Sequence, residues 1–575
     1  MPKPSQIKRR SIPSNVSLAV NNPVLERIFA ARGITAQAQL DYRLASMLKP
    51  TLQGLGAACE LLEQALRESW SILIVGDFDA DGATSTAVII RALRAMGAAK
   101  VGYLVPNRFE YGYGLSPEIV EVAAKMQPQL IITVDNGISS IAGVAKAAEY
   151  AIPVLVTDHH LPGDELPRAA VIVNPNLLND DFESKNLAGV GVVFYLMAAL
   201  RSHLRQCGWF TEQGIAEFNV ATLLDLVALG TVADVVALDY NNRILVDQGL
   251  KRIRAGHCVA GLSALIEVGK RNAQQLVASD LGFAVGPRLN AAGRLEDISI
   301  GIECLLTDDA SRALQLAQQL DDINHERRHI EQTMKLEAFA EMEGLEAKLK
   351  QVALPAGLCL YKQDWHQGVV GILASRVKDK YHRPVIVFAQ EGKGMIKGSA
   401  RSVQGVHIRD ALEYVSSQNP GLIAKFGGHA MAAGLSMALE NLTVFKAAFA
   451  DYVQQQLGDQ VGLKQVLTDG ELVAGQFSMT LADEIRQSGP WGQQFPEPLF
   501  DGVFKILDKR VLKDAHLKMT LEHASGEVFD AIAFNERGEW ITSAVQHIRI
   551  AYKLDINEFR GRKSIQLMVD YLEAV

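Results

Sequence analysis

Acidic side chains and imidazoles follow short apolar runs at three places in this sequence. They are Asp77, Asp79, Asp81, Asp135, Asp158, His159 and His160. So many like charges can share one site only if cations neutralise them or some of them take up protons. Carboxylates with imidazoles and no thiolate suit hard or borderline ions, so these residue types predict a site for one or two Mg2+ or Mn2+ ions.

The apolar runs are the elements that must position these side chains. Residues 71–76, 130–134 and 153–157 are short and apolar, and helical patterns separate them, which is typical of buried strands in a parallel sheet. Ligands bind beyond the carboxyl ends of such strands, so the charged groups are expected at one edge of the sheet. Each cluster alone could be an ordinary turn, as Asp81-Gly82 illustrates, but the repeated placement after a strand favours a metal site.

The motifs resemble those of the DHH phosphoesterases and, within that superfamily, the RecJ family of single-strand-specific exonucleases. The DHH motifs are matched by 79–82, 135–137, 158–160, and Asp225 with 230–234. Supporting stretches are 107–108, 113–115, 286–294, 366–371, 398–402 and 427–429. The resemblance covers nearly the whole chain. It implies an α/β fold: a parallel-sheet DHH catalytic domain, a long connecting helix, a smaller α/β DHH-associated domain and a C-terminal β-barrel of the OB-fold type.

A chain of 575 residues exceeds what one hydrophobic core usually supports. The helix expected from about Ser311 to Glu343 lacks Pro and Gly and is either a rigid strut between domains or an ordinary packed helix. The predicted division is an N-terminal segment 1–55, the DHH domain 56–305, the connecting helix 306–350, the DHH-associated domain 351–453 and the barrel domain 454–575.

Substrate contacts are predicted on two domains. Small residues let a backbone approach a phosphate closely, and Arg401 can form two hydrogen bonds to its oxygens. Gly427-Gly428 alone would more often be a simple turn, and His429 a surface imidazole. With the resemblance, the predicted substrate-binding residues are Arg108, Arg288, Asn290, Arg294, His366, Ser399, Arg401, Ser402, Gly427, Gly428 and His429.

The last part of the sequence alternates apolar and polar residues between turn signals, which predicts a small antiparallel barrel. Phe504 is interleaved with basic residues there, as in a groove that stacks bases and follows a nucleic-acid backbone. A buried aromatic core with a solvated basic face is an equal alternative. The basic residues are Lys505, Lys509, Arg510, Lys513 and Lys518.

The expected catalytic residues are Asp79, Asp81, Asp135, His159, His160 and Asp225. All of these except His160 are assigned as metal ligands, with Asp135 as the bridging ligand if there are two ions. Asp77 and Asp158 are assigned to the same centre in supporting positions, and His160 polarises the phosphate or assists proton transfer. Asp234 competes with Asp225 for the fourth motif, and family position favours Asp225. Many DHH members have a metal-binding His where this sequence has Val75, so Asp77 would compensate.

The leading functional prediction is a metal-dependent exonuclease that degrades single-stranded DNA from the 5′ end to mononucleotides in mismatch, recombinational and base excision repair. The polarity, and partners such as a single-strand-binding protein and a RecQ-type helicase, are implied by the resemblance alone. A small-substrate phosphodiesterase or pyrophosphatase and an inactive scaffold are the alternatives.

Composition further limits the possible partners and cellular setting of the protein. The net charge of −8 argues mildly against a nucleic-acid binder on bulk electrostatics, although much of the acid belongs to the predicted metal site. No run is apolar enough to span a bilayer, and the basic start lacks the apolar core of a signal peptide. Scattered cysteines without metal-ligand spacing indicate a reduced, cytoplasmic setting. A monomer is expected because no coiled-coil seam is visible.

Overall fold

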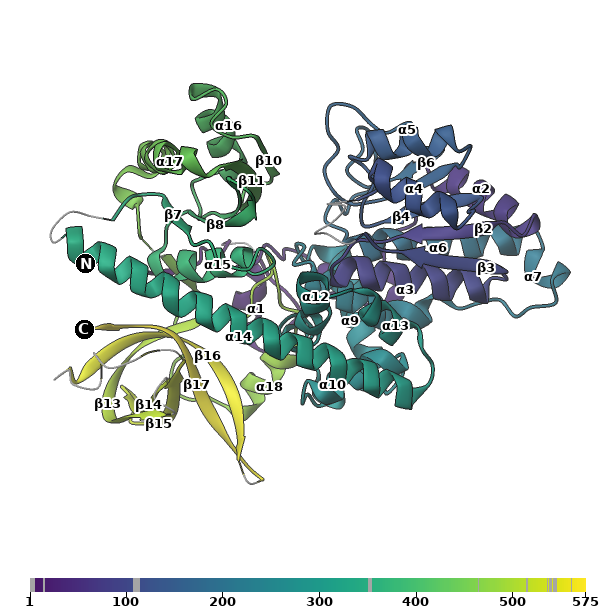
Figure 1. Ribbon diagram of the computed structural model, residues 1–575. Coiled ribbons are helices and arrows are strands. Elements are labelled where there is room, and N and C mark those ends of the chain that lie inside the picture. The colour runs from purple at the N-terminus through teal and green to yellow at the C-terminus, as the bar shows by residue number, and fades with distance from the viewer. Residues whose placement is uncertain are drawn as a thin grey trace.

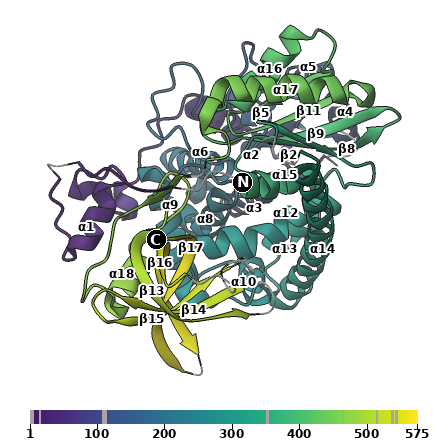
Figure 2. The same ribbon diagram turned by 90° about the vertical axis from the view of Figure 1, so that its left-hand side faces the viewer.

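The computed structural model describes residues 6–13, 16–106, 114–349, 354–463, 465–512, 516–534, 536, 540, 545–559 and 561–575. A parallel-sheet domain and a second α/β domain lie at either end of one long helix (Figure 1), and a small β-barrel lies apart from that helix, as the turned view shows (Figure 2). Within the described residues, no helix combines the length and apolarity needed to cross a membrane.

The first domain is built on a parallel sheet of strand order β3-β2-β4-β5-β6. Ile72 and Ile74 of the central strand β2 pack into the core on one face, while Leu73 and Val75 pack into the core on the other. Because both faces are covered, the strands are apolar throughout, which explains why their runs do not alternate. The strands are β2 (Ser71–Val75), β3 (Lys100–Leu104), β4 (Leu130–Val134), β5 (Val154–Thr157) and β6 (Val171–Val173).

Helices cover both faces of this sheet. The cores on the two faces contain residues of α2, α3 and α6 on one side and of α4 and α5 on the other. These helices are α2 (Leu55–Arg67), α3 (Ala80–Ala95), α4 (Pro117–Lys125), α5 (Ile141–Glu149) and α6 (Gly189–Gln206), followed by the short α7 (Trp209–Glu212).

A helical subdomain follows the sheet. The apolar run before Asp225 is not a strand, because it forms the 3-10 turn η3 (Val220–Leu223) and then enters α8 (Leu224–Ala233). The remaining elements are α9 (Tyr240–Arg254), α10 (Ala260–Val268), α11 (Ala278–Asp280), the π-helical turn η5 (Leu281–Val285), α12 (Gly286–Leu295) and α13 (Ser299–Leu306).

The long helix expected from the sequence is α14 (Ala310–Leu349). Its first half inserts Leu316 and Leu320 into the core of the catalytic domain, and its second half packs Met334 and Met342 against the second domain. The helix therefore acts as a strut that belongs to two cores, which fixes the distance between them.

The second α/β domain has a mixed sheet of order β10-β11-β9-β8-β7. Its strands are β7 (Leu358–Tyr361), β8 (Val385–Gly392), β9 (Met395–Arg401), β10 (Lys425–Gly428) and β11 (Ala432–Ala438). Its helices are α15 (Val370–Tyr381), α16 (Ile408–Gln418) and α17 (Leu442–Leu457).

The C-terminal strands form a closed barrel, as the alternating pattern predicted, in the order β13-β14-β15-β17-β16. The barrel is not wholly antiparallel, because β15 pairs in parallel with β17. Phe504 is 1 % exposed in the barrel core, so the prediction that its ring stacks on bases is wrong. Lys505 and Lys518 pair with carboxylates on neighbouring strands, and Lys513 lies outside the described residues. The strands are β13 (Phe500–Leu512), β14 (His516–His523), β15 (Val528–Ala533), β16 (His547–Phe559) and β17 (Arg562–Ala574).

The N-terminal segment joins the barrel rather than standing alone. Strand β1 (Gln6–Arg9) pairs in parallel with β12 (Gln465–Thr468), which leads into the barrel domain. Helices α1 (Pro23–Ala30) and α18 (Met479–Gln487) lie close to this junction (Figure 2). We call the junction of residues 6–32 with 465–501 the N-terminal clasp.

Candidate metal centre

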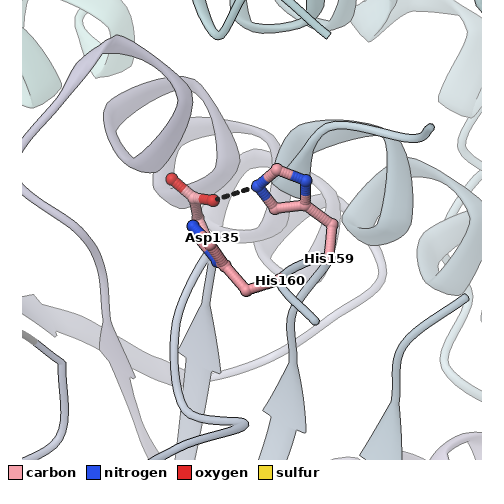
Figure 3. Close-up of side chains that lie close together, drawn as sticks. All are labelled: Asp135, His159 and His160. Carbon is pink, nitrogen blue, oxygen red and sulfur yellow. Dashed lines mark ion pairs between the residues drawn. The ribbon is translucent and has the colours of Figure 1, made fainter. Parts of the chain in front are cut away.

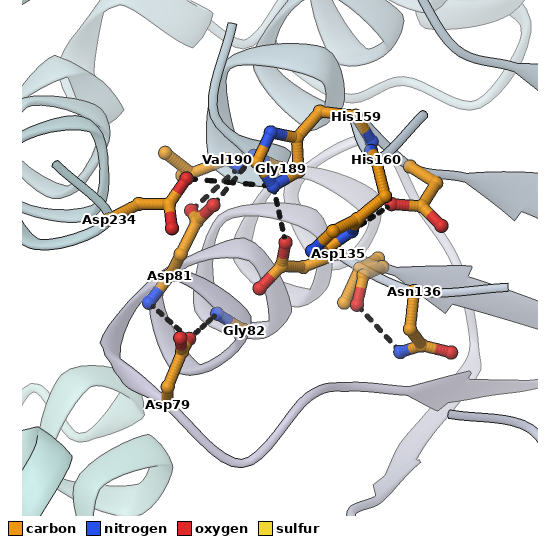
Figure 4. A network of polar contacts seen from close by, with 12 residues as sticks. Asp79, Asp81, Gly82, Asp135, Asn136, His159, His160, Gly189, Val190 and Asp234 are labelled. Carbon is orange, nitrogen blue, oxygen red and sulfur yellow. Dashed lines mark hydrogen bonds and ion pairs between the residues drawn. The ribbon is translucent and has the colours of Figure 1, made fainter. Parts of the chain in front are cut away.

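The first acidic loop joins strand β2 to helix α3. Asp79 caps α3, and its Oδ1 accepts hydrogen bonds from the backbone N–H groups of Asp81 (2.9 Å) and Gly82 (3.0 Å). Asp81 is 1 % exposed, and its carboxylate accepts the N–H groups of Gly189 (2.6 Å) and Val190 (2.9 Å) at the start of α6. Backbone N–H groups at two helix N-termini therefore hold these carboxylates in place (Figure 4).

Asp135 stands at the carboxyl end of the adjacent strand β4 and has a φ of +62°. Its N–H donates to the carbonyl of Thr157 (3.1 Å) on strand β5, which holds this left-handed conformation in place. A Cβ atom at Gly189 would lie 2.6 Å from the Asp135 Cβ atom, so helix α6 reaches the carboxylate only because residue 189 is glycine. Backbone strain retained at such a point is typical of functional sites.

Asp158 organises the two histidines. Its Oδ1 lies 2.7 Å from Nδ1 of His160 and accepts the backbone N–H of His159 (2.7 Å), while its Oδ2 accepts the N–H of Ile138 (2.9 Å). Burial alone raises the pKa of Asp158, but the hydrogen bond and charge of His160 outweigh it and lower the pKa overall. The ionised carboxylate thus fixes the loop, and Nε2 of His159 lies 3.1 Å from Oδ1 of Asp135 (Figure 3).

Asp234, and not Asp225, lies in this cluster. Asp234 follows the last turn of α8, and its Oδ2 is 3.5 Å from Nε2 of His159. Asp225 is fully buried in the first turn of the same helix, where its Oδ2 accepts the N–H of Val259 (2.8 Å). The geometry therefore corrects the preference for Asp225, because the run before it is helical and does not bring it to a strand end.

Burial and like charge shift the pKa values of these groups in the directions that a cation site needs. Burial first, and the Asp79 charge second, raise the pKa of Asp81 to about 7. Burial and neighbouring carboxylates also raise the pKa values of Asp135 and Asp234 well above the ordinary value. Burial, and then the charge of His160, lower the pKa of His159 to about 4, so its imidazole is neutral and can act as a ligand.

The donor atoms fit a divalent ion. In three overlapping sets, the ligand atoms lie within 4.8 Å of one another, and both Asp135 and His159 belong to two of the sets. Oδ2 of Asp234 and Nε2 of His159 are buried without a hydrogen bond to the described residues, and a cation would satisfy both atoms. The sets are Asp135 with His159 and His160, Asp81 with His159 and Asp234, and Asp77 with Asp79 and Asp135.

The second domain contributes a guanidinium without a carboxylate partner among the described residues. Nη1 of Arg401 donates to Oγ of Ser399 (3.1 Å) and to the carbonyl of Ala400 (2.8 Å), and burial lowers the pKa of Arg401. A Cβ atom at Gly371 would lie 2.9 Å from Nη2 of Arg401, so the guanidinium touches the first turn of α15. A guanidinium beside a helix N-terminus is suited to bind an anion.

Contacts across the two domains place further predicted residues near one another. Nη1 of Arg294 donates to the carbonyl of Gly368 (3.2 Å), whose N–H donates to Nδ1 of His366 (3.1 Å). Partial burial, and then the charge of His160, lower the pKa of His429, so the two imidazoles are close enough to interact electrostatically.

Arg288 and Ser402, which were predicted to contact substrate, are bound inside the protein. The side chain of Arg288 is 7 % exposed, and its Nη2 lies 2.7 Å from Oδ1 of Asp321, so it ties α12 to α14. Ser402 is 1 % exposed and donates its hydroxyl to the carbonyl of Val406 (2.7 Å). Neither side chain is available to a phosphate in this structure.

The other predicted substrate-binding residues differ in where the structure places them. Oδ1 of Asn290 accepts the N–H of Ala80 (2.8 Å), so this side chain supports the start of α3. Gly427 and Gly428 belong to strand β10 and not to a turn. Arg108 lies outside the described residues.

Comparisons with known proteins agree with this arrangement. The DHH family N-terminal domain matches residues 71–231, the DHHA1 domain matches 353–455, and the RecJ OB domain matches 468–571. The single-stranded-DNA-specific exonuclease RecJ of Escherichia coli K12 is 53 % identical over 569 residues, which is 98 % of each chain. The chain belongs to the RecJ family. The RecJ exonuclease of Dickeya dadantii is 55 % identical over 552 residues, or 96 % of each chain.

Solved structures of this family support the fold. The crystal structure of RecJ from Thermus thermophilus in complex with Mn2+ aligns with a TM-score of 0.78 and 31 % identity, covering 96 % of this chain and 76 % of that one. The structure of the same protein with Mg2+ aligns with a TM-score of 0.73 and 29 % identity, over 96 % of this chain and 75 % of that one. The family resemblance, the fold and the acidic residues able to hold a metal are thus confirmed.

Sequence reasoning missed the groups that hold the ligands in place. The N–H groups of Gly189 and Val190 position Asp81, and the amide side chain of Asn176 donates to the carbonyl of His159 (2.6 Å). Backbone amides carry no side-chain signature, so only the glycine at position 189 could have indicated this close approach.

Proposed function

We propose that this RecJ-family chain is a metal-dependent exonuclease that removes nucleotides from the 5′ end of single-stranded DNA. The observation that carries the proposal is the convergence of buried Asp81 and Asp135, and of half-buried Asp234, on the neutral imidazole of His159. The names of the close relatives, which are single-stranded-DNA-specific exonucleases, supply the substrate class. The 5′ polarity follows from the family resemblance.

The cluster would hold one or two Mg2+ or Mn2+ ions through Asp77, Asp79, Asp81, Asp135, His159 and Asp234. A bound ion of this kind lowers the pKa of a water molecule and neutralises charge on a phosphodiester. Asp135 belongs to two ligand sets and is therefore the proposed bridging residue. Asp158 keeps both imidazoles oriented and does not need to touch the metal.

His160 can hold a proton beside the reacting phosphate. Burial acts to lower its pKa, but the hydrogen bond with Asp158 and the nearby carboxylates raise the pKa overall. With Nδ1 bound to Asp158, Nε2 is the ring nitrogen that would donate to a phosphate oxygen. His160 would therefore stabilise negative charge that develops during in-line attack.

The second domain would bind a phosphate near the metal cluster. Arg401, Ser399 and the start of α15 form an anion-binding corner with no described carboxylate in it. We propose that this corner, together with His366 and His429, binds the terminal phosphate of the DNA strand. Binding of the terminal phosphate would direct cleavage to the end of the strand rather than to an internal bond.

Two other functional classes fit less well. A small-substrate phosphodiesterase would not need the barrel, which matches the RecJ OB domain over residues 468–571. An inactive scaffold would have no reason to keep several buried carboxylates together, because their mutual repulsion is costly without a cation. We place the enzyme in the cytoplasm in mismatch, recombinational and base excision repair, as a monomer that works with a single-strand-binding protein and a RecQ-type helicase.

The decisive experiment is digestion of a 5′-labelled single strand with and without Mn2+ or Mg2+, beside a matched duplex and pyrophosphate. We expect metal-dependent release of labelled mononucleotide from the single strand and none from the Asp135→Asn variant. Release of internal fragments would exclude the exonuclease proposal. Hydrolysis of pyrophosphate alone would keep the metal centre and move the chain to the small-substrate class.

A further inference from the structure

One aromatic side chain in the helical subdomain is largely exposed to solvent. Phe283 is 80 % exposed, although phenylalanine is normally buried in soluble proteins. It lies in the π-helical turn η5, and such turns occur often at functional sites.

The π-helical turn packs directly against the end of the helix that carries Asp234. A Cβ atom at Gly282 would lie 3.2 Å from Cγ1 of Val232, and one at Gly286 would lie 3.1 Å from Cβ of Ala233, the residue before Asp234. The turn that carries Phe283 therefore lies against the residues that precede Asp234.

Phe283 faces a cavity of about 900 Å³ between the helical subdomain and the barrel. One wall includes Val235, which follows Asp234 and is 63 % exposed with a φ of +61°. Another wall belongs to the barrel and includes Phe534, which is 51 % exposed. One residue of the cavity wall, Val235, thus directly follows the proposed metal ligand Asp234. The walls also include two exposed aromatic rings from different domains, those of Phe283 and Phe534.

The charges on the cavity walls indicate which part of a DNA strand fits there. Carboxylates outnumber cations on the walls, and Lys553 pairs with Glu497 (2.8 Å). The charged lining residues are Asp247, Asp280, Glu497, Asp555 and Asp570 with Arg254, Arg486 and Lys553. Carboxylates repel phosphates but accept hydrogen bonds from base amino groups. The cavity therefore suits bases, while the backbone follows a different path.

We propose that Phe283 is a base-stacking residue that holds the single strand as it leaves the metal centre toward the barrel. This inference rests on the proposed function, since it assigns the substrate's bases to a named side chain. Stacking on an aromatic ring tolerates every base, as a nuclease without sequence preference requires. A paired base has no free face at such a ring, so the same contact favours a single strand over a duplex.

The first test measures binding of an oligonucleotide of roughly 12 nucleotides in the presence of a chelator, which prevents hydrolysis. The Phe283→Ala variant is expected to bind roughly 5- to 100-fold more weakly than the unaltered protein. Phe283→Trp is expected to restore binding, and Val444→Ala, which truncates a 54 % exposed side chain on α17, should change nothing. An abasic strand of the same length should bind equally to the unaltered protein and to Phe283→Ala.

The second test places 2-aminopurine at successive positions of the strand and follows its fluorescence. Stacking on Phe283 predicts quenching at one position in the unaltered protein and loss of that quenching in Phe283→Ala. Equal weakening on normal and abasic strands would overturn the inference, because the ring would then act without a base. Unchanged DNA binding together with a changed sedimentation coefficient would also overturn it and would make Phe283 a protein contact. If the unaltered protein bound no single-stranded DNA at all, the proposed function itself would fail.

Discussion

Buried carboxylates occur in two regions of this molecule with opposite surroundings. In the metal centre, burial and neighbouring carboxylates raise the pKa values of Asp135 and Asp234. In the N-terminal clasp, burial also acts to raise the pKa of Asp501, but hydrogen bonds from Arg9, Arg549 and Thr468 outweigh it and lower the pKa. The same residue type thus lies among like charges in one place and beside guanidinium groups in the other.

This difference in surroundings distinguishes a site that binds an external ion from an ion pair that holds two segments of the chain together. Asp469 in the clasp is fully buried at the side chain and lies 2.7 Å from the equally buried guanidinium of Arg32. Such a pair needs no further ion, because the protein supplies the positive charge. In the metal centre, Asp81 and Asp234 have no arginine or lysine partner among the described residues, so a bound cation would supply the positive charge.

The largest expected effect distinguishes Asp234 from Asp225. Asp234→Asn should lower the rate of single-strand hydrolysis by about 10³-fold or more, as expected when transition-state charge loses its stabilisation by a metal site. Initial rates at saturating Mn2+, with folding checked by circular dichroism, measure this loss.

Asp225→Asn is the matched control at the other end of α8. Its amide oxygen can still accept the N–H of Val259, so the rate should change only slightly. If Asp225→Asn lost as much activity as Asp234→Asn, Asp225 would be the metal ligand of the fourth motif, as the sequence favoured.

The second-largest expected effect is a loss of stability when an ion pair of the N-terminal clasp is removed. Arg32→Ala should lower the free energy of unfolding by about 3–5 kcal/mol, because it leaves the buried carboxylate of Asp469 without its cation. Urea unfolding followed by intrinsic fluorescence measures the change. Arg43→Ala removes an ion pair whose arginine side chain is 79 % exposed and should leave the midpoint unchanged, so equal effects would contradict the contrast between buried and exposed pairs.

The contrast also shows how much of the metal centre and of the barrel could be predicted from the sequence. Asp79, Asp81, Asp135 and His159 were recognisable because each follows an apolar run, and adjacent parallel strands end at one edge. Asp234 follows a helix, so no strand pattern could favour it over Asp225. The barrel was visible in the alternating pattern, but its buried Phe504 and its exposed Phe534 could not be told apart from spacing alone.

The clasp was not predicted, and the reason is physical. Strands β1 and β12 are four residues each and lie far apart in the sequence, so neither has a local pattern that identifies its partner. Arg9 and Arg32 resembled ordinary basic residues until their partners Asp501 and Asp469 were known. Long-range pairing of this kind depends on tertiary structure and leaves no signal in composition.

The third expected effect is stabilisation by metal. Mn2+ at about 100 times its dissociation constant should add about 2.7 kcal/mol to the stability of the native state, because the ion binds only the assembled cluster. Calorimetry of the metal-free and metal-loaded protein detects this as a rise in the melting temperature. The rise should disappear in Asp135→Asn and persist in Arg43→Ala, and a rise in both variants would mean that the ion binds elsewhere.

The smallest effect is the pH response of the clasp. The folded-state pKa of Asp501 lies below its ordinary value of 3.8, so the unfolded chain binds more protons between these two values. The stability that the clasp gains from this ionisation is therefore complete above pH 3.8 and is lost as pH falls through the folded-state pKa. Urea unfolding at a series of acidic pH values should show a steeper loss of stability in the unaltered protein than in Asp501→Asn, which has no proton to take up at this position. Identical slopes would show that the ion pairs of Asp501 do not contribute to closing the N-terminal segment onto the barrel domain.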